Sequence, residues 1–412
     1  MPHRTGMGMP VRVLRIITRF NIGGPAIHAA LLSNQLDPEQ FSTWLVTGTP
    51  DATEGDLSDL LRRERMSVIQ LKTFRQPLHP WLDLVTLARL VRIVWSTRPQ
   101  IIHTHMAKAG ALGRFAGFLY NRFGPGRRSE LRAVLIHTFH GHVLDGYFSP
   151  RVSRFFITIE RWLARRTDCL IAVSETIQRE LLAYGIGRRE QWRVVSLGLD
   201  LGSLTALPLP NGAATVRFGM VGRLVPIKNP SLFLQAFDGL RARLPGQSVR
   251  GVVVGDGPLR SSLEAQAAGL GLHDAMTFTG WQRDVSAIYR HLEVACLTSW
   301  NEGTPVALIE AMAAGRAVVA TRVGGVQDLL GDEPDVPQAI APGTYQVTKR
   351  GVLVRPGDVE GLIGAMTRLA QDAALRRQLG STARAHVLER FSHVRLVREM
   401  SALYEALVRE AT

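Results

Sequence analysis

Cysteine is almost absent from this sequence: its 412 residues include two, Cys169 and Cys296, each within a short apolar run. Such positions are typical of small core residues, so we expect no disulfide and a reducing compartment. No stretch approaches the roughly 18 uninterrupted apolar residues of a membrane-spanning helix. The N-terminus, MPHRTGMGMPVRVLRII, has arginines where an apolar signal segment would begin. These absences predict a cytoplasmic protein, attached at most to the inner face of the cell membrane.

Acidic residues are scarce in the first half of the chain. Residues 1–208 contain 27 Lys and Arg against 16 Asp and Glu, a net charge of +11, whereas the remainder has 22 against 19, or +3. This asymmetry indicates an anionic partner such as phospholipid, and the alternative is a generally arginine-rich surface. Two stretches, 113–128 and 150–166, mix arginines with aromatics and are candidates for lying on an anionic membrane surface, with 113–128 the favoured contact.

Repeats and low-complexity tracts are also absent, and short apolar strands alternate with helical patterns throughout. This alternation predicts parallel sheets covered by helices. The Gly- and Pro-rich segment 202–214 interrupts it and is typical of a linker. We therefore expect an α/β protein with two doubly wound Rossmann-like domains facing across a cleft. Strands are expected at 11–17, 42–47, 66–71, 100–105, 133–139, 168–173, 192–196, 216–221, 249–255, 275–280, 293–299 and 317–321.

Unusual residues follow several of these strands, where open α/β sheets bind their ligands. Gly23 and Gly24 follow the first strand and precede a helix, an arrangement that lets a backbone approach an anion or forms a plain tight turn. Arg223 and Lys228 follow the first strand of the second half, and two such cations can neutralise a diphosphate leaving group or be ordinary surface charges. The loop GDGPLR (255–260) is either part of a nucleotide loop or a turn.

The most specific segment is SWNEGTPVALIEAMAAGRAVVAT (299–321). Thr304 is expected to cap a helix whose first residue is Pro305. Glu310 then lies about 9 Å along the axis from Thr304, at 1.5 Å per residue. Glu302 and Glu310 therefore need not act as a pair, and we expect them to contact different hydroxyls of one extended ligand.

Histidines gather at the ends of two strands of the first half: His103, His105, His137, His140 and His142. A zinc site there is conceivable. No cysteine or carboxylate lies nearby in sequence, so we expect no metal and no other cofactor. His140, followed by Gly141, is the better candidate for a phosphate or sugar contact.

The chain resembles the family-4 retaining glycosyltransferases of GT-B fold, of the bacterial surface-polysaccharide type. The likeness spans nearly the whole sequence and rests on IGGPAIH, HTHMAKAGALGRFAG, HTFHGH, IAVSE, GRLVPIKN, VGDGPL, FTGW and EGTPVALIEAMAAGRAVVAT. It implies an acceptor-binding domain at 1–205, a donor-binding domain at 206–390, and a C-terminal helix at 391–412 that crosses back to the first domain.

The resemblance also implies roles for the site residues. Arg223 and Lys228 would hold the donor diphosphate, Glu310 the ribose hydroxyls, and Glu302 the donor sugar. Backbone N–H groups would come from Gly303, Thr304, Pro305 and Val306, although the proline has none to offer. Gly23 and Gly24 would contact the phosphates, and His140 the sugar or the transition state.

One departure matters: many members have Glu-Gly-Phe-Gly where this chain has Glu302-Gly303-Thr304-Pro305, which leaves the transferred sugar open.

The sequence therefore predicts a metal-independent, retaining hexosyltransferase. It would transfer a hexose or N-acetylhexosamine from a nucleotide diphosphate sugar, for which we expect a UDP-sugar. The acceptor would be lipid-linked or a saccharide, in cell-surface polysaccharide synthesis. Nucleic acid is not an expected partner. The alternative is an isomerase of the nucleotide-sugar 2-epimerase type, which uses a related scaffold and needs no acceptor. A catalytically inactive binding subunit is a third reading, disfavoured by the intact Arg223, Lys228, Glu302 and Glu310.

Overall fold

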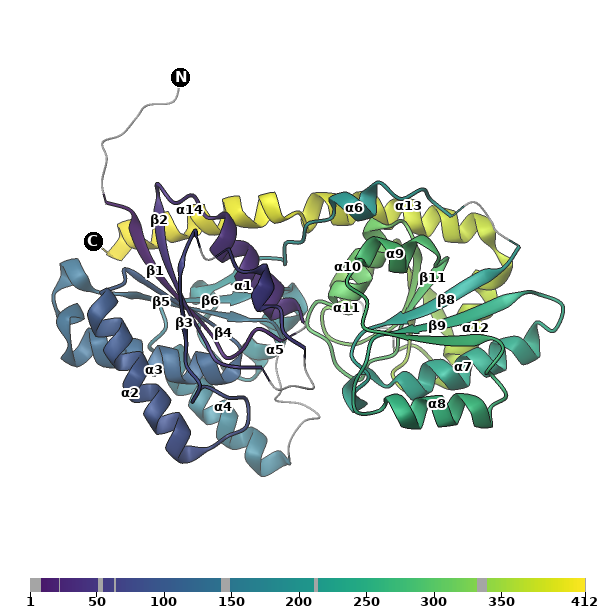
Figure 1. The fold of residues 1–412 in the computed structure, drawn as a ribbon, viewed down its shortest axis with the longest axis horizontal. Helices are drawn as coiled ribbons and strands as arrows, with labels where there is room; N and C mark the ends of the chain where they lie inside the picture. The colour runs from purple at the N-terminus through teal and green to yellow at the C-terminus, as the bar shows by residue number, and fades with distance from the viewer. Residues whose placement is uncertain are drawn as a thin grey trace, which may run out of the picture. The chain divides into compact units, whose positions relative to one another are not determined.

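The computed structural model describes residues 9–21, 23–50, 55–62, 64–141, 149–210, 214–331 and 339–411. It contains two compact units (Figure 1). Unit 1 comprises Met1–Val173, Ile177–Leu199 and His393–Thr412, and unit 2 comprises Ser174–Thr176 and Asp200–Ser392. The chain therefore leaves unit 1 near Leu199 and returns to it at His393.

Unit 1 is built on a seven-stranded sheet in the order β3-β2-β1-β4-β5-β6-β7, and every neighbouring pair is parallel. The order reverses direction between β1 and β4, the position at which doubly wound sheets bind ligands. Its strands are β1 (Val11–Ile17), β2 (Phe41–Thr47), β3 (Ser67–Gln70), β4 (Ile101–His105), β5 (Val134–Phe139), β6 (Cys169–Ala172) and β7 (Trp192–Val194).

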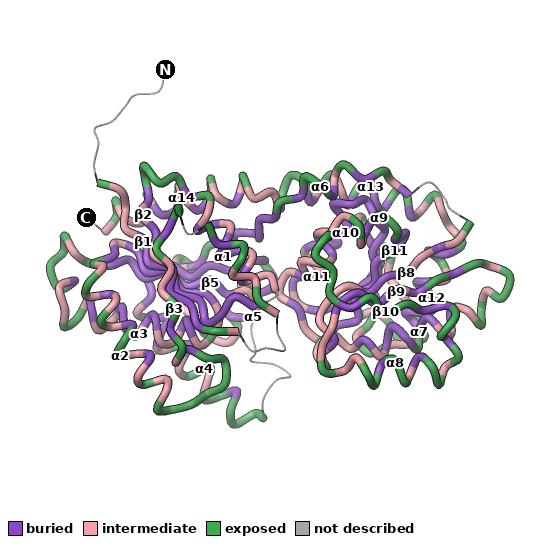
Figure 2. Tube along the Cα trace, viewed as in Figure 1, coloured by how far each residue is buried: buried purple, intermediate pink, exposed green. Residues whose placement is uncertain are grey.

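Helices cover both faces of this sheet. The helices associated with unit 1 are α1 (Gly24–Gln35), α2 (Pro80–Thr97), α3 (Ala107–Phe123), α4 (Pro150–Ala164), α5 (Glu175–Ala183), whose first two residues are assigned to unit 2, and α14 (His393–Ala411). Alternation along β1 divides the core, because Val13 packs with α1 and α14 whereas Leu14 packs with α2 and α3. The tube in Figure 2 shows the resulting buried strands between half-exposed helices.

Local sequence signals account for several helix ends. Pro80 begins α2 directly after His79, whose Nδ1 accepts a hydrogen bond from the Leu82 N–H at 3.3 Å. Asp358 and Asp372 cap two helices of unit 2 in the same manner. Such side chains satisfy N–H groups that the helix itself leaves unpaired.

Unit 2 repeats the design with the sheet order β10-β9-β8-β11-β12-β14-β13, parallel except for β13, which is antiparallel to β14. Its strands are β8 (Val216–Val221), β9 (Val249–Val254), β10 (Met276–Gly280), β11 (Val294–Leu297), β12 (Ala317–Thr321), β13 (Tyr345–Val347) and β14 (Val352–Val354). Its helices are α6 (Gly202–Thr205), α7 (Pro230–Arg243), α8 (Arg260–Gly269), α9 (Val285–Arg290), α10 (Val306–Ala313), α11 (Val326–Leu330), α12 (Val359–Gln371) and α13 (Ala373–Arg390).

Short 3-10 turns connect some of these elements, at Ser58–Leu60, Pro125–Arg127, Ser129–Leu131, Arg189–Gln191 and Pro226–Lys228. Both cysteines are buried and free, as the sequence predicts. None of the helices in the described part of the chain combines the length and the apolarity needed to cross a bilayer.

The predicted α/β class with two doubly wound sheets is confirmed, and all twelve expected strands are present. β13 and β14 are not among the expected strands. The prediction that 202–214 is a linker is wrong for its first part. Residues Gly202–Thr205 form α6, Leu204 is buried, and the carbonyls of Leu207 and Pro208 accept hydrogen bonds from arginines of unit 2.

Candidate active site

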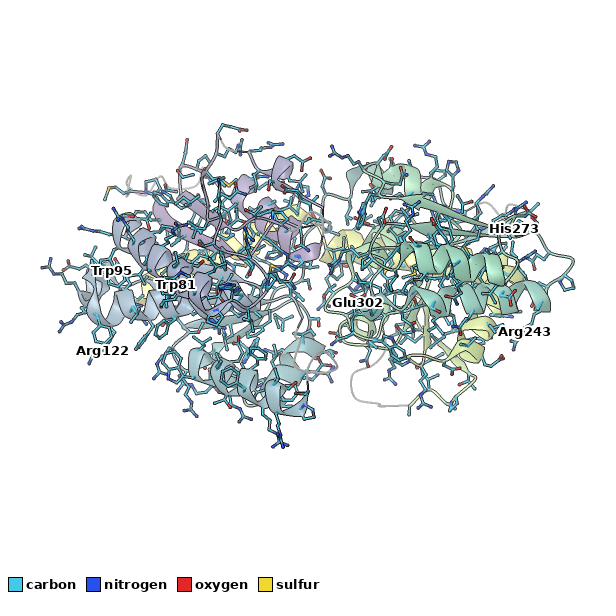
Figure 3. All side chains as sticks on the ribbon, turned by 60° about the horizontal axis from the view of Figure 1, so that its bottom comes forward. Trp81, Trp95, Arg122, Arg243, His273 and Glu302 are labelled. Carbon is cyan, nitrogen blue, oxygen red and sulfur yellow. The ribbon has the colours of Figure 1, made fainter. Side chains whose placement is uncertain are left out.

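The centre of the candidate donor site in unit 2 is an ion pair between Lys228 and Glu302 (Glu302 labelled in Figure 3). The same Glu302 oxygen accepts a hydrogen bond from Ser299 Oγ at 2.6 Å. Glu302 is 8% exposed, whereas the Lys228 side chain is 22% exposed. The Glu302 carboxylate is therefore held in place by Ser299, and the Lys228 ammonium is partly accessible to solvent.

Two loops that follow neighbouring strands bring this pair together. Lys228 lies in the loop after β8, and Glu302 lies in the loop after β11, which pairs with β8. Thr298 Oγ1 lies 3.0 Å from the Lys228 carbonyl and 2.9 Å from the Asn229 carbonyl, and the Trp300 N–H donates to the Ile227 carbonyl. These bonds fasten one loop to the other, so the ion pair is a product of sheet topology.

The GDGPLR loop supports the loop that carries Arg223. A Cβ atom on Gly255 would lie 2.0 Å from the Gly222 carbonyl oxygen, and one on Gly257 would lie 2.5 Å from the Leu224 oxygen. Both glycines have positive φ, so only residues without a side chain fit here. Arg223 itself is half-buried. The glycines of this loop are explained by backbone packing against residues 222–224.

Helix α10 begins one residue later than expected. Its first residue is Val306, and Pro305 is the N-cap with φ −75° and ψ 111° and no side-chain hydrogen bond. The Pro305 carbonyl accepts the N–H groups of Leu308 and Ile309, so the prediction of Thr304 as the cap is wrong. The extended Pro305 starts the first turn, and its carbonyl accepts the first backbone hydrogen bonds of the helix.

Glu310 lies on α10 and has partners different from those of Glu302. Its Oε2 lies 3.1 Å from the Tyr289 hydroxyl, which donates to the Ala307 carbonyl at 2.8 Å. Burial raises the pKa of Glu310 to about 7, and the hydrogen bond with Tyr289 acts in the opposite direction. The Glu310 carboxyl group therefore changes its charge near neutral pH, and it can accept hydrogen bonds from a ligand.

Sequence reasoning missed Gly324 and Gly325, which follow β12. A Cβ on Gly324 would lie 1.9 Å from the Glu302 carbonyl oxygen, and one on Gly325 would lie 2.3 Å from the Gly303 oxygen. The glycine pair therefore lets the β12 loop lie against the backbone of Glu302 and Gly303. The available signal was a Gly-Gly pair directly after a strand, the same pattern that identified Gly23 and Gly24.

In unit 1 the glycine loop after β1 is open. Helix α1 starts at Gly24, and its N-cap, Gly23, lacks a side-chain hydrogen bond. A Cβ on Gly23 would meet only Pro25 Cδ, at 3.8 Å. Its φ of 164° is ordinary extended backbone, so neither packing nor conformation requires glycine here. The explanation that the sequence suggests for glycine at position 23 is the close approach of a ligand to its backbone.

The histidines of unit 1 separate into two groups. His105 Nδ1 lies 3.1 Å from His140 Nε2, and His28, on α1, stacks edge-on against His140. His137 instead contacts Thr104 on the other face of the sheet, at 2.8 Å. His28 was missed because a single histidine within the helical pattern gives no signal. The predicted His142 lies outside the described residues.

In the first group His28 and His105 are buried, His140 is half-buried, and all three imidazoles are neutral at pH 7. Burial lowers the pKa of His28 and of His105 well below the usual range, and lowers the pKa of His140 to about 3. Among the residues that the structure describes, both ring nitrogens of His28, Nε2 of His105 and Nδ1 of His140 have no hydrogen-bond partner. One nitrogen of each ring lies within 4.8 Å of the others, and no carboxylate or cysteine joins them in the described ranges.

Comparison with known proteins agrees with this architecture. The chain resembles crystal structures of Anabaena Alr3699/HepE in complex with UDP and glucose, and of sucrose-phosphate synthase from Thermosynechococcus elongatus. In each case the TM-score is 0.74, the identity 21%, and the other chain is covered completely, with 96% and 97% of this chain aligned. The fold is therefore GT-B, as the sequence predicts.

Family models identify the protein class. Residues 23–198 match the "Glycosyl transferase 4-like domain", and residues 215–372 match "Glycosyl transferases group 1". An Escherichia coli relative, the UDP-Gal:alpha-D-GlcNAc-diphosphoundecaprenol alpha-1,3-galactosyltransferase, is 26% identical over 337 residues, 79% of this chain and 80% of its own. Putative glycosyltransferase EpsD of Bacillus subtilis is 25% identical over 347 residues, 81% and 83% of the two chains. The chain belongs to the glycosyltransferases that combine these two domains.

Proposed function

We propose that this protein is a metal-independent, retaining glycosyltransferase that transfers a hexose or N-acetylhexosamine from a UDP-sugar. The observation that carries the proposal is the buried Glu302 paired with Lys228 beside helix α10. Support for uridine comes from the UDP named for the Anabaena structure and the UDP-Gal named for the E. coli relative.

Unit 2 would bind the donor. Lys228 and Arg223 supply positive charge for the diphosphate, and the N-terminal end of α10, the positive end of the helix dipole, supplies more. Glu310 accepts hydrogen bonds from the ribose hydroxyls. Glu302, fixed by Ser299, accepts from a hydroxyl of the transferred sugar.

The ion pair also explains how charge would be handled during transfer. When the glycosidic bond to the diphosphate breaks, negative charge grows on the leaving group. The Lys228 ammonium, partly exposed and attached to a flexible stem, can share its hydrogens between Glu302 and a phosphate oxygen. In this proposal the two cations take the place of a divalent ion at the diphosphate, and transfer proceeds without one.

Residues of unit 1 complete the proposal. The open backbone at Gly23 and Gly24 would contact phosphate oxygens, and His140 would contact the transferred sugar. Because His140 is neutral at pH 7, one ring nitrogen donates and the other accepts, which suits a sugar hydroxyl.

The acceptor we propose is lipid-linked or a saccharide, within cell-surface polysaccharide synthesis at the cytoplasmic side of the membrane. The E. coli relative is named for a diphosphoundecaprenol acceptor, which favours the lipid-linked class.

A ligand screen by thermal unfolding tests the donor assignment. A ligand that binds the folded state raises Tm by mass action. UDP and one UDP-sugar should raise Tm at concentrations where GDP and ADP do not. Equal shifts with all three nucleotides would contradict a uridine-specific site, and hydrolysis or epimerisation of the sugar without acceptor-dependent transfer would contradict the transferase.

A further inference from the structure

Five of the exposed apolar side chains of unit 1 lie near the start of two helices. Leu78 and Trp81, beside the N-terminus of α2, are 69% and 68% exposed, and Phe155 of α4 is 62% exposed. Leu84 and Val152 extend the set at 56% and 39%. We call these five residues the apolar edge: Leu78, Trp81, Leu84, Val152 and Phe155.

Topology places both helix starts at the same edge of the sheet. Strands β4 and β5 are neighbouring and parallel. Helix α2 ends where β4 begins, so α2 starts near the carboxyl ends of the strands, and α4 starts there too because it follows β5. Lys108, at the start of α3 after β4, confirms this for α2. Its ammonium pairs with Asp83 and donates to the carbonyls of Arg75 and Pro77.

Helix α4 projects beyond α3 at this edge. Glu160, ten residues after Pro150, pairs with Arg114, which lies seven residues after Ala107, the start of α3. Three extra residues at 1.5 Å each raise the start of α4 by roughly one turn. Figure 2 shows the exposed surface along the beginning of α4 and the outer side of α2.

The charge around the apolar edge is positive. Arg75, Arg151 and Arg154 are exposed beside it. The one carboxylate in segments 72–84 and 149–159 is Asp83, which is already paired with Lys108. Large apolar side chains beside exposed arginines match the interface of an anionic bilayer, where the apolar groups enter the acyl boundary and the arginines face the headgroups.

Part of the segment that the sequence favoured for this contact, 113–128, is packed inside unit 1. Arg114 is 1% exposed and paired with Glu160, and Phe118 packs against Trp162 and beneath Arg166. Of the aromatics in 113–128, Phe123 is the large exposed one, and it lies at the far end of α3. Arg114 and Phe118 are therefore engaged in internal contacts, and the exposed Phe123 lies at the opposite end of α3 from the helix starts of the apolar edge.

We propose that the apolar edge docks unit 1 on an anionic membrane surface. This inference rests on the proposed function for its biological purpose. His105 and His140 lie at the carboxyl ends of β4 and β5, the same edge of the sheet, so docking there brings the histidines to the level of lipid headgroups. The acceptor this favours is lipid-linked, with its polar head at the histidines and its tail left in the bilayer.

Vesicle co-sedimentation of the full chain tests the proposal. The vesicles are pure phosphatidylcholine, or phosphatidylcholine with 30% phosphatidylglycerol, at low and high salt. We expect binding to the anionic vesicles alone, weakened by salt. Trp81→Ser with Phe155→Ser should reduce it about tenfold or more, and so should Arg151→Glu with Arg154→Glu.

Matched controls use the far end of α3. Phe123→Ser removes an equally exposed aromatic, and Arg127→Glu with Arg128→Glu reverses two exposed charges. Both should bind vesicles like the parent chain. Loss of binding in these controls, unchanged binding in the edge variants, or no binding to any vesicle would overturn the proposal. Sugar transfer to a water-soluble acceptor analogue is measured in parallel. If the edge variants still catalyse this transfer, membrane docking and catalysis are separate properties. If neither the parent chain nor the variants catalyse it, the proposed function fails independently of the vesicle result.

Discussion

The guanidinium of Arg15 on the first strand donates a hydrogen bond at 3.0 Å to the hydroxyl of Tyr404 on the last helix, 389 residues away. That hydroxyl lies 2.6 Å from His103 Nδ1, whose other nitrogen lies 2.7 Å from Thr138 Oγ1. The His103 tautomer with its proton on Nε2 satisfies all these groups, because the hydroxyl then accepts from Arg15 and donates to Nδ1. This chain of bonds fixes helix α14 on the sheet of unit 1.

Tyr404→Phe should therefore destabilise the protein. The change keeps the ring but removes the hydroxyl that pairs with the Arg15 guanidinium and with His103 Nδ1. Both Arg15 and His103 are buried. Buried polar groups left unpaired cost about 1–3 kcal/mol. Thermal and urea unfolding measure the loss, and Tyr345→Phe in unit 2 is the matched control. A Tm equal to that of the parent chain would show that the bond adds nothing.

Acid should weaken unit 1. Burial lowers the pKa of His28, His103, His105 and His137 well below the usual range. The unfolded imidazoles titrate near pH 6.5, so between pH 7.5 and 5.5 the unfolded state takes up more protons and the free energy of unfolding falls. Glu310 acts in the opposite direction, so Tm is best followed in a Glu310→Gln background. A Tm that rises on acidification there would contradict the buried, neutral histidines.

Glu310→Gln should weaken donor binding and raise the stability of the folded protein at alkaline pH. The pKa of about 7 means that the folded carboxyl holds its proton more tightly than the unfolded one, so folding is penalised as pH rises through the interval from 4.5 to 7. The amide removes this penalty, and we expect a higher Tm than the parent at pH 8 and little difference at pH 5. Donor binding should weaken roughly tenfold or more, because a charged hydrogen bond is worth about 1.5–3 kcal/mol. Calorimetry with UDP measures it, and unchanged affinity would remove Glu310 from the ribose site.

Neutralising Arg223 and Lys228 together should lower kcat more than it raises KM. The leaving diphosphate gains charge in the transition state, so the lost stabilisation appears mainly in the chemical step. Replacing Lys228 also leaves Glu302 without its cation, so the melting temperature of the variant must be checked first. Arg290→Ala with Lys349→Ala removes two other cations of unit 2 as the control. A folded double variant with near-normal kcat would exclude the role.

Much of the fold was predictable because most strands are short apolar runs and several long helices carry a start signal, as at His79 and Pro80. The site was predictable only in part. Lys228 and Glu302 could be named from their places after strands, but their pairing depends on β8 and β11 being neighbours, a non-local fact. The Glu302 backbone is held by Gly324 and Gly325, and that contact depends on the neighbouring β12 loop. His28 was missed for the same reason, since only the folded sheet brings it to His105 and His140.

The most direct test of the central claim is the anomeric configuration of the product, followed by proton NMR from the first turnovers. The reaction contains the full chain, a UDP-sugar chosen by the thermal screen, a lipid-linked or saccharide acceptor, and EDTA. The account predicts acceptor-dependent transfer with the donor's configuration retained, at a rate that the chelator does not change. An inverted product would contradict the retaining mechanism. Activity lost in EDTA and restored by Zn²⁺ would contradict metal independence and point to His28, His105 and His140 as the ligands.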